Sequence, residues 1–327
     1  MPESPLLLLR SSDIARLIAF EDVVRTQEQG FIALVEDRAE LGERVLLRGA
    51  ANSVVFSYAA RMGAGGPAVS KFGSVVPGNA TRGLPSVSSI VVALDGETGR
   101  PVAIVDGDEL TALRTVAASV AVVRALVDRP RRVAVIGSGI QGERHGVAAL
   151  RHLGAQEVRV WSPDRSRALA LGESLRRETG DAQIVVPTSP RLAVEGADVA
   201  FLCTNSFDPV VAGDWLSPGA LVVSIGAFAP HRREVGREVL SRARLVVDHR
   251  DTAIRQCGHL ADAIAAGVVA AEDVVEIGDI YTGRAPARAE HGTVTVYSSV
   301  GVGIQDAAVV DELLRRARGA DVGSVEW

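Results

Sequence analysis

The sequence has almost no lysine, little cysteine, few aromatic residues and no long apolar run. Of its 35 basic residues, 34 are arginine and one, Lys71, is lysine, and aromatic residues make up 4% of the chain. Two cysteines, Cys203 and Cys257, are too few for a disulfide framework or a cysteine-rich zinc site, and we expect both to be buried. No stretch approaches the ~20 apolar residues of a membrane span or the pattern of a secretory signal. We therefore expect a cytoplasmic protein with no membrane partner.

The remaining composition is typical of a globular protein with about two domains. The chain has 327 residues, of which 47% are hydrophobic and 23% charged, and its formal net charge is −5 at pH 7. That balance excludes the strongly basic character of a nucleic-acid-binding protein. The six histidines show no close pair at helical spacing with a third ligand, so we expect no metal site. His145 and His152, seven residues apart on one helix, are expected at the surface.

The first part of the chain combines helices with short strands. Apolar residues recur at helical spacing over 11–40 and again over 109–127, which predicts a helix in each segment. Residues 45–105 contain short β-branched runs separated by glycine and proline, which predicts a strand-rich region. A final helix is predicted to return to this part. We thus expect an α+β domain for substrate binding and dimerisation, formed by 1–125 and 304–327.

From residue 131 onward, buried strands alternate with helical segments. The pattern begins with RRVAVIG and continues through EVRVWS, AQIVV, DVAFLC, LVVSIG and ARLVVD. Such alternation indicates βαβ units and a parallel sheet. We expect 126–303 to form a Rossmann-type, doubly wound domain that binds a dinucleotide. The predicted fold class is therefore α/β, with this domain joined to a discontinuous α+β domain.

A glycine motif follows the first of these strands. Residues 137–142, GSGIQG, place Gly137, Gly139 and Gly142 in the G-x-G-x-x-G spacing between a strand and a helix. In this setting the first glycine permits a tight turn, the second lets the backbone approach a pyrophosphate, and the third lets the helix pack closely. We expect the whole loop to bind the cofactor, including the residues between the glycines: Ser138, Ile140 and Gln141.

The end of the second strand bears on the choice of cofactor. NAD is commonly bound there by an acidic residue that accepts a hydrogen bond from the ribose 2′-hydroxyl. Trp161 and Ser162 occupy that position here, and Arg165 and Arg167 follow. A hydroxyl and an arginine suit a 2′-phosphate, so Ser162 and Arg165 predict a preference for NADPH. Asp164 leaves NADH open, because a shifted loop would let it bond a ribose hydroxyl.

Residues 71–119 carry a series of motifs. Lys71 is followed, in order, by P-G-N, G-L-P, D-x-x-T-G-x-P and L-T-A-L-R-T-x-A-A-S. Downstream come GSGIQG, ADVAFLCTNSFDPVV, IGAFAPHRREV, VVDHRDTAIRQCGHL, IGDIYTG and SSVGVGIQD. In these motifs and their order, the chain resembles the ornithine cyclodeaminase/mu-crystallin family over roughly residues 10–318.

The resemblance implies a homodimer in which the first domain joins a sheet to its partner, and an active site between the two domains. It also implies that a lysine and two arginines line a pocket for a small imino or amino acid: Lys71, Arg114 and, by spacing, Arg44, with Arg48 as the competing placement. Arginine binds both oxygens of a carboxylate. A lysine beside other cations has a lowered pKa and can donate a proton as a hydride arrives. Thr115 is expected to contact the cofactor or the substrate.

Further site residues follow from their position in the chain and from the same resemblance. Asn79 and Pro85 are predicted to shape the loop over the substrate pocket. Thr204 follows a parallel strand, at the edge where ligands bind in open α/β sheets, and by resemblance it faces the cofactor. The resemblance places Ser299 and Gly301 near the nicotinamide.

One departure from the family pattern bears on the activity. Cyclodeaminases of the family carry an aspartate in a motif written roughly G-G/A-D-x-P-G-K-x-E-L, where it performs acid–base chemistry on the departing amine. Phe228 occupies that place in GAFAPHRRE, and a phenyl ring cannot transfer a proton. The G-A-F-x-P form resembles members that reduce cyclic ketimines, so Phe228 is predicted to form an apolar wall of the substrate pocket. His231, three residues on, is an alternative acid, although a histidine on a loop is more commonly solvated.

These observations together predict an NAD(P)H-dependent reductase of imino acids such as pyrroline- or piperideine-2-carboxylate. Hydride is expected at the C=N carbon, with Arg44 and Arg114 on the carboxylate and Lys71 as the proton donor. Within the family, two alternatives stay open: a cyclodeaminase or amino-acid-condensing synthase that recycles bound NAD, and an amino acid dehydrogenase. A further alternative is a mu-crystallin-like ligand-binding protein.

Overall fold

The computed structural model describes residues 5–178 and 180–326. The chain divides into two compact units, one formed by Met1–Ala118 with Val302–Trp327 and the other by Ser119–Gly301. The first boundary falls inside helix α3 (Gly107–Leu126), and the second lies just before helix α11 (Gly303–Ala317). The division made from the sequence, at 125/126 and 303/304 with a role for each part, stays a prediction.

The first unit is built on a mixed sheet. Among the described residues its strand order is β16-β1-β7-β6-β5-β4-β2, and β3 also pairs with β4. The pairs β4–β5, β5–β6 and β6–β7 are antiparallel, whereas β1 pairs with β7 in parallel. The bounds are β1 (Leu6–Leu9), β2 (Glu40–Leu41), β3 (Val45–Arg48), β4 (Val54–Arg61), β5 (Ala68–Val75), β6 (Val87–Leu94), β7 (Pro101–Asp106) and β16 (Gly323–Val325). The predicted strand-rich region is confirmed, while β1 and β16 were not predicted.

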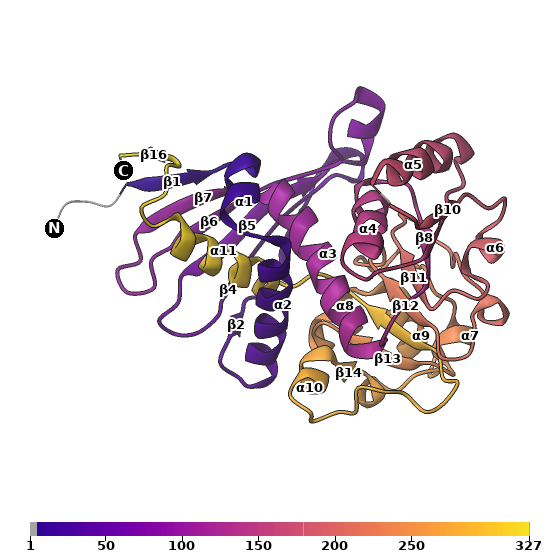
Figure 1. Cartoon of the computed structure of the whole chain (residues 1–327). Coiled ribbons are helices and arrows are strands. Elements are labelled where there is room, and N and C mark those ends of the chain that lie inside the picture. Colours follow the sequence, from indigo (N-terminus) through magenta and orange to yellow (C-terminus); the bar gives the residue numbers. More distant parts are fainter. Residues whose placement is uncertain (1–4, 179, 327) are drawn as a thin grey trace. The chain divides into compact units, whose positions relative to one another are not determined.

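Helices α2 (Phe20–Val35) and α11 pack together, and α11 lies against β4 and β5 (Figure 1). Because side chains alternate along a strand, β5 has a covered and an open face. Lys71 is buried on the face toward α11, whereas the next residue, Phe72, is 53% exposed on the other. The fold therefore places the single lysine of the chain in the interior of this unit.

The prediction of one helix over 11–40 is wrong. Two helices occupy this segment, α1 (Ser11–Leu17) and α2, and Ile18 between them is extended, with φ −132° and ψ 127°. Ile18 is nevertheless buried, so the apolar spacing continues across the break. Periodicity reports a buried face and does not register a short interruption of the helix.

The second unit contains a wholly parallel sheet, with order β10-β9-β8-β11-β12-β15-β13-β14 among the described residues. From β8 the chain first builds β9 and β10 on one side and then crosses to β11 on the other. This reversal between β8 and β11 is the topological switch point at which open α/β sheets bind ligands. The bounds are β8 (Arg132–Ile136), β9 (Glu157–Trp161), β10 (Gln183–Val185), β11 (Val199–Leu202), β12 (Leu221–Ser224), β13 (Arg244–Val247), β14 (Val275–Glu276) and β15 (Thr295–Ser298). The Rossmann-type prediction is confirmed.

Helices flank this sheet, and α4 and α5 are the longest of those wholly within the described part of the unit (Figure 1). The set comprises α4 (Ile140–Arg151), α5 (Arg165–Glu178), α6 (Pro190–Val194), α7 (Arg237–Leu240), α8 (Arg250–Gln256), α9 (Gly258–Ala265) and α10 (Ile277–Tyr281). The expectation of a surface position is wrong for His145 on α4. Its ring is fully buried, with Nδ1 2.7 Å from the carbonyl oxygen of Gln141 and Nε2 2.9 Å from Ser119 Oγ. Burial lowers the pKa of His145 to about 4, so the imidazole is neutral.

Candidate active site

The glycine loop between β8 and α4 has the geometry that its spacing predicts. Gly137 adopts φ +117°, and a Cβ on it would lie 2.3 Å from the carbonyl oxygen of Cys203. A Cβ on Gly142 would lie 2.1 Å from the carbonyl oxygen of Gly137. Among the described residues, a Cβ on Gly139 would meet no atom within 4 Å beyond its own neighbours. The first and third glycines are therefore needed for close packing, and the second leaves an open surface at the start of a helix.

The residues between these glycines complete a cradle that fits a dinucleotide. Ser138 Oγ donates a hydrogen bond of 3.0 Å to the Oγ of Ser162, which links the loop to the end of β9. Ile140 is exposed at the start of α4, and the Oε1 atom of Gln141 is buried with no hydrogen-bond partner among the residues that the structure describes. An open backbone surface at a helix N-terminus suits an anionic pyrophosphate.

The segment after β9 bears on the choice between NADPH and NADH, which the sequence left open. Asp164 accepts hydrogen bonds from Ser166 Oγ at 2.6 Å and from the backbone N–H of Arg167 at 3.2 Å, so its carboxylate caps α5. Ser162 is buried, and Arg165 is exposed and donates to the carbonyl oxygen of Pro187 at 3.1 Å. Asp164 is therefore engaged within its own turn.

A buried carboxylate joins the loops that follow β11 and β12. Glu234 accepts hydrogen bonds from the backbone N–H and hydroxyl of Thr204, at 2.7 and 2.8 Å, from Ser224 Oγ at 2.6 Å and from the N–H of Gly226 at 2.8 Å. Complete burial outweighs these bonds and raises the pKa of Glu234 to about 7. The Thr204 hydroxyl is thus committed to Glu234, and Glu234 holds two loops at the ligand edge.

A second buried carboxylate holds the loop after β15. Asp248 accepts hydrogen bonds from the N–H groups of Val300 and Gly301, at 2.9 and 2.8 Å, and from Ser299 Oγ at 3.4 Å. Burial raises the pKa of Asp248 above its ordinary value, although the hydrogen bonds oppose that change. The predicted cofactor residues Ser299 and Gly301 are therefore fixed to the end of β13.

Lys71, Arg114 and Tyr58 converge on one carboxylate in the first unit. Lys71 Nζ and Arg114 Nε each lie 3.3 Å from Asp306 Oδ1, and the Tyr58 hydroxyl donates to Asp306 Oδ2 at 2.8 Å. Arg114 also donates to Gln305 Oε1 at 3.1 Å. Lys71 is 2% exposed and Asp306 1% exposed. The structure thus brings together two of the residues predicted to act on the substrate and adds a counter-ion.

This cluster changes the acidity of its members. Burial, together with the Arg114 and Arg44 cations, lowers the pKa of Lys71 to about 8, against the opposing charge of Asp306. Burial alone would raise the pKa of Asp306, but the Lys71 and Arg114 cations outweigh it and hold that pKa below its usual value. Burial also raises the pKa of Tyr58 far above its ordinary range, so its hydroxyl stays a neutral donor. At neutral pH the cluster contains a carboxylate and a buried ammonium that loses its proton readily.

Arg44 contacts a member of this cluster, whereas no such contact is seen for its competitor, Arg48, within the described residues. Its guanidinium carbon lies 5.2 Å from the centroid of the Tyr58 ring, whereas Arg48 is exposed in β3. Thr115 is buried, and its hydroxyl donates to the Thr111 carbonyl oxygen at 2.7 Å. The structure therefore places the Thr115 hydroxyl within its own helix.

The other predicted pocket residues, Asn79 and Pro85, belong to a separate loop in this unit. Asn79 Nδ2 donates to the carbonyl oxygen of Pro85 at 3.0 Å, and the N–H of Leu84 donates to the carbonyl oxygen of Asn79 at the same distance. These bonds close the turn between β5 and β6, and the predicted position of this loop over the substrate pocket stays a prediction.

The sequence matches the ornithine cyclodeaminase/mu-crystallin family over residues 12–320. The chain belongs to this family. Mouse ketimine reductase mu-crystallin is 31% identical over 231 residues, which cover 70% of this chain and 69% of the mouse protein. Family membership confirms the resemblance that the motifs carry.

Solved structures of similar proteins share the fold over nearly the whole chain. The Δ1-pyrroline-2-carboxylate reductase of Thermococcus litoralis, solved with NADH and L-proline, has a TM-score of 0.91 at 26% identity, covering 98% of this chain and 100% of that one. An archaeal alanine dehydrogenase dimer with bound NAD has a TM-score of 0.90 at 26% identity, covering 98% and 99%. With these relatives, this family member is an NAD(P)-dependent oxidoreductase.

Phe228, which the motif resemblance aligns with an aspartate of cyclodeaminases, is stacked under a cation. The guanidinium carbon of Arg232 lies 4.8 Å from its ring centroid, and Arg232 Nη1 donates to Asn205 Oδ1 at 2.8 Å. His231 is exposed, with its ring 5.7 Å from that of Phe207. The exposed His231 agrees with the solvated position expected of a loop histidine.

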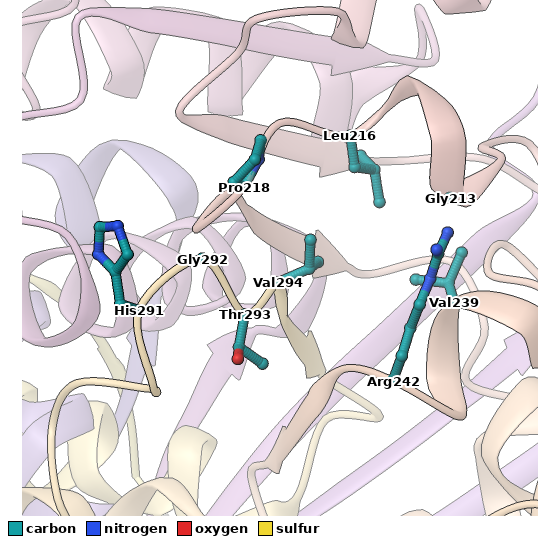
Figure 2. Close-up of a pocket in the computed structure, with 9 residues that line it drawn as sticks. All are labelled: Gly213, Leu216, Pro218, Val239, Arg242, His291, Gly292, Thr293 and Val294. Atoms are coloured by element: carbon teal, nitrogen blue, oxygen red, sulfur yellow. The ribbon is translucent and has the colours of Figure 1, made fainter.

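Figure 2 shows a pocket at the opposite edge of the parallel sheet. It is lined by residues that precede β12, β13 and β15, namely Gly213, Leu216, Pro218, Val239, Arg242, His291, Gly292, Thr293 and Val294. Ligands of open α/β sheets bind outside the carboxyl ends of the strands, whereas this pocket lies at their amino ends. We therefore do not assign it to the cofactor.

In the described part of the chain, no helix has the length and apolar character needed to span a membrane.

Three carboxylates of these sites were missed from the sequence. Asp306, Glu234 and Asp248 all lie inside motifs that carry the family resemblance, SSVGVGIQD, IGAFAPHRREV and VVDHRDTAIRQCGHL. Each is at most 2% exposed. Acidic residues are rarely buried unless they are paired, so an aspartate or glutamate within an apolar motif was the available signal.

Proposed function

We propose that the chain is an NAD(P)H-dependent reductase of imino acids that acts on cyclic ketimines such as pyrroline- or piperideine-2-carboxylate. The observation that carries the proposal is the buried Lys71 ammonium, 3.3 Å from Asp306 and on the same carboxylate as Arg114. A protonated amine with a pKa near 8 can give up a proton at neutral pH. The names of the family's ketimine and pyrroline-2-carboxylate reductases support the substrate class.

The chemistry requires a hydride at the C=N carbon and a proton at the nitrogen. Bound NAD(P)H supplies the hydride. Lys71 Nζ donates its proton to the imine nitrogen, which takes the electron pair of the C=N π bond, and the neutral lysine then regains a proton from solvent. Arg114 and Arg44 bind the substrate carboxylate, because guanidinium groups match its two oxygens. We favour Arg44 over Arg48 because Arg44 lies over Tyr58, which contacts Asp306.

The residues proposed to hold the cofactor are those of the glycine loop, 137–142, with Ser162, Arg165, Thr204, Ser299 and Gly301 at the carboxyl edge of the sheet. We infer a preference for NADPH over NADH. The carboxylate of Asp164 is engaged in capping α5, which leaves Ser162 and Arg165 as the polar groups at the end of β9. Thr115 is proposed as a secondary contact. Phe228 supports reduction over deamination, because it offers no proton in place of the family's aspartate.

A homodimer is proposed from the open face of the sheet in the first unit. Val45 on β3, Phe72 on β5 and Ile90 on β6 are 59%, 53% and 48% exposed, and they share one face, because the register pairs Val45 with Ser57, Ser57 with Phe72 and Phe72 with Ile90. Adjacent exposed apolar side chains of this kind mark an interaction surface. The archaeal alanine dehydrogenase is a dimer, which supports a second copy of this chain as the partner.

The proposal is tested by following nicotinamide absorbance with candidate substrates. Pyrroline-2-carboxylate and piperideine-2-carboxylate are expected to oxidise NADPH. Lys71→Arg keeps a cation, whose pKa exceeds ~12, but offers no removable proton. The variant is expected to fold, and its turnover is expected to fall about 100-fold or more. Lys71→Ala with wild-type turnover would rule out the proton-donor role. Ammonia release from ornithine with bound NAD would instead identify a cyclodeaminase, and cofactor binding without any turnover a ligand-binding protein.

A second candidate is a reversible amino acid dehydrogenase that acts on an open-chain imine. The structural similarity to an archaeal alanine dehydrogenase, at a TM-score of 0.90 over 98% of the chain, favours it. Pyruvate with ammonia would then oxidise the reduced cofactor, and L-alanine would reduce the oxidised one. Activity with pyruvate and ammonia that exceeds activity with both cyclic ketimines would select this candidate.

A further inference from the structure

Asp306 is the common partner of the polar side chains in the first unit. It lies at the start of α11 and meets Lys71 from β5, Tyr58 from β4 and Arg114 from α3. Lys71 and Arg114 both approach Oδ1, and the Tyr58 hydroxyl approaches Oδ2. One carboxylate on α11 therefore connects this helix to β4, β5 and α3, which lie about 200 residues or more earlier in the chain.

The charged and neutral polar groups around Lys71 come from several elements of this unit. Asp306 is the negative group, whereas Arg114 and the more distant Arg44 are positive. Lys71 also donates a hydrogen bond to Thr111 Oγ1, a neutral group on α3. Helix α2 contributes a neutral group, because Gln27 Nε2 donates to the backbone carbonyl of Gln305. Without Asp306, the buried ammonium would face two cations and no anion among these groups.

We propose that Asp306 is a positioning residue that keeps Lys71 protonated and holds its ammonium beside the Arg114 guanidinium. This role rests on the proposed function, in which Lys71 is the proton donor. The effect of Asp306 on the protonation of Lys71 can nevertheless be measured separately from catalysis. A buried ammonium is stabilised by an adjacent carboxylate, and without one it loses its proton. Asp306 thereby sets the pH at which the proton donor is charged, and it touches neither substrate nor cofactor in this scheme.

The composition of the chain makes the test direct. Lys71 is the sole lysine, so protein labelled with ¹⁵N at the lysine side chain has one Nζ signal to follow by NMR. In the wild type this signal is expected to titrate near pH 8. In Asp306→Asn, which removes the charge but keeps the size, it is expected to titrate at a pH lower by about 1 to 3. An unchanged titration in a folded Asp306→Asn variant overturns the proposal.

Two variants separate charge from a general disturbance of the fold. Asp311→Asn is the matched control, because Asp311 lies on the same helix and pairs with Arg315 at 3.9 Å. Tyr58→Phe disturbs the Asp306 site but leaves its charge. Lys71 is expected to titrate as in the wild type in Asp311→Asn, and to keep a titration near pH 8 in Tyr58→Phe. A fall in Tyr58→Phe as large as in Asp306→Asn would assign the effect to packing and overturn the role of the charge.

A measurement on the wild type alone covers the case in which Asp306→Asn does not fold. The ¹³C signal of the Asp306 carboxyl carbon is expected to shift across the same pH range in which Lys71 loses its proton. This follows because the two groups are 3.3 Å apart and buried, so the carboxylate senses the loss of the ammonium. An Asp306 signal that stays constant through the Lys71 titration overturns the proposal without any variant.

Activity provides the functional readout. With a cyclic ketimine, wild-type kcat is expected to fall above pH 8, and in Asp306→Asn this decline should move to lower pH together with the Lys71 NMR titration. At pH 8, where about half of wild-type Lys71 is protonated, a Lys71 titration lower by one pH unit should reduce kcat about fivefold, and each further unit about tenfold. If Lys71→Ala keeps wild-type turnover, the proton-donor function fails while the NMR result still decides the role of Asp306. If NMR and activity move separately, the link between Asp306 and catalysis is overturned.

Discussion

Gly139 and Gly142, three residues apart in the glycine loop, should respond differently to the same substitution. Gly139→Ala places a methyl group on an open surface, since a Cβ there meets no described atom within 4 Å. Gly142→Ala places it 2.1 Å from the backbone oxygen of Gly137. The first variant should lose cofactor affinity and keep its stability, and the second should lose stability.

The magnitudes follow from backbone geometry and packing. Gly139 has φ −86° and ψ −174°, which alanine adopts, so its replacement should leave stability unchanged or raise it by about 0.4–1 kcal/mol. At Gly142 the methyl group meets a backbone carbonyl, so the overlap should cost about 3 kcal/mol. Better helix propensity returns about 1 kcal/mol, which leaves a net loss of about 2 kcal/mol. For a unit of this size, that loss lowers Tm by about 4–8 °C.

Thermal unfolding and titration of NADPH fluorescence measure the two effects separately. Gly139→Ala is expected to raise the Kd for NADPH by about tenfold or more, because about 1.4 kcal/mol of lost contact is a factor of ten. Gly65→Ala, also in open space but in the other unit, is the matched control and should change neither quantity. A Gly139→Ala protein with wild-type Tm and wild-type Kd would refute the binding of a pyrophosphate at this loop.

Three further variants test other parts of the structure. In Glu234→Gln an NH2 group replaces one of two oxygens that each accept two hydrogen bonds, so unfolding by denaturant should show a loss of about 1–3 kcal/mol. Burial raises the pKa of Glu234 from 4.5 to about 7, so between these pH values the folded protein holds a proton that the unfolded chain releases. Wild-type stability should therefore fall as pH rises from about 4.5 to 7, and Glu234→Gln should lack this dependence on pH. Arg165→Ala should raise the KM for NADPH about tenfold relative to that for NADH in steady-state assays, whereas Arg177→Ala on the same helix should leave the ratio unchanged. Phe72→Asp should shift the protein to a monomer in sedimentation velocity, whereas Leu169→Asp at an exposed site of the other unit should not.

The parts of the fold that the sequence predicts well are those that local pattern specifies. The parallel strands of the second unit are buried on both faces and read as continuous apolar runs, and β8, β11 and β12 were placed from these runs. Strand β1 has an equally apolar sequence, LLLL, but its parallel partner β7 lies almost 100 residues away. No local signal marks such a pairing, so β1 was missed.

The candidate site also has parts that the local sequence predicts and parts that only the fold brings together. The glycine loop was predictable because its turn, helix start and backbone approach are all encoded within six residues. Asp306 was not, because its partners come from β4, β5 and α3, and only the fold brings them to one carboxylate. The same holds for Glu234, whose donors follow two different strands.

The single lysine of the chain, Lys71, and its buried counter-ion, Asp306, together bear on the chemistry at position 71. Elsewhere the chain uses arginine for positive charge, including Arg114 on the same Asp306 carboxylate. An arginine at position 71 would keep an ion pair with Asp306, but its guanidinium stays protonated above pH ~12. For a lysine there, burial and the two neighbouring cations lower the pKa to about 8, against the opposing charge of Asp306. Charge alone therefore does not account for lysine at this position, whereas the proton-donor role proposed for Nζ does.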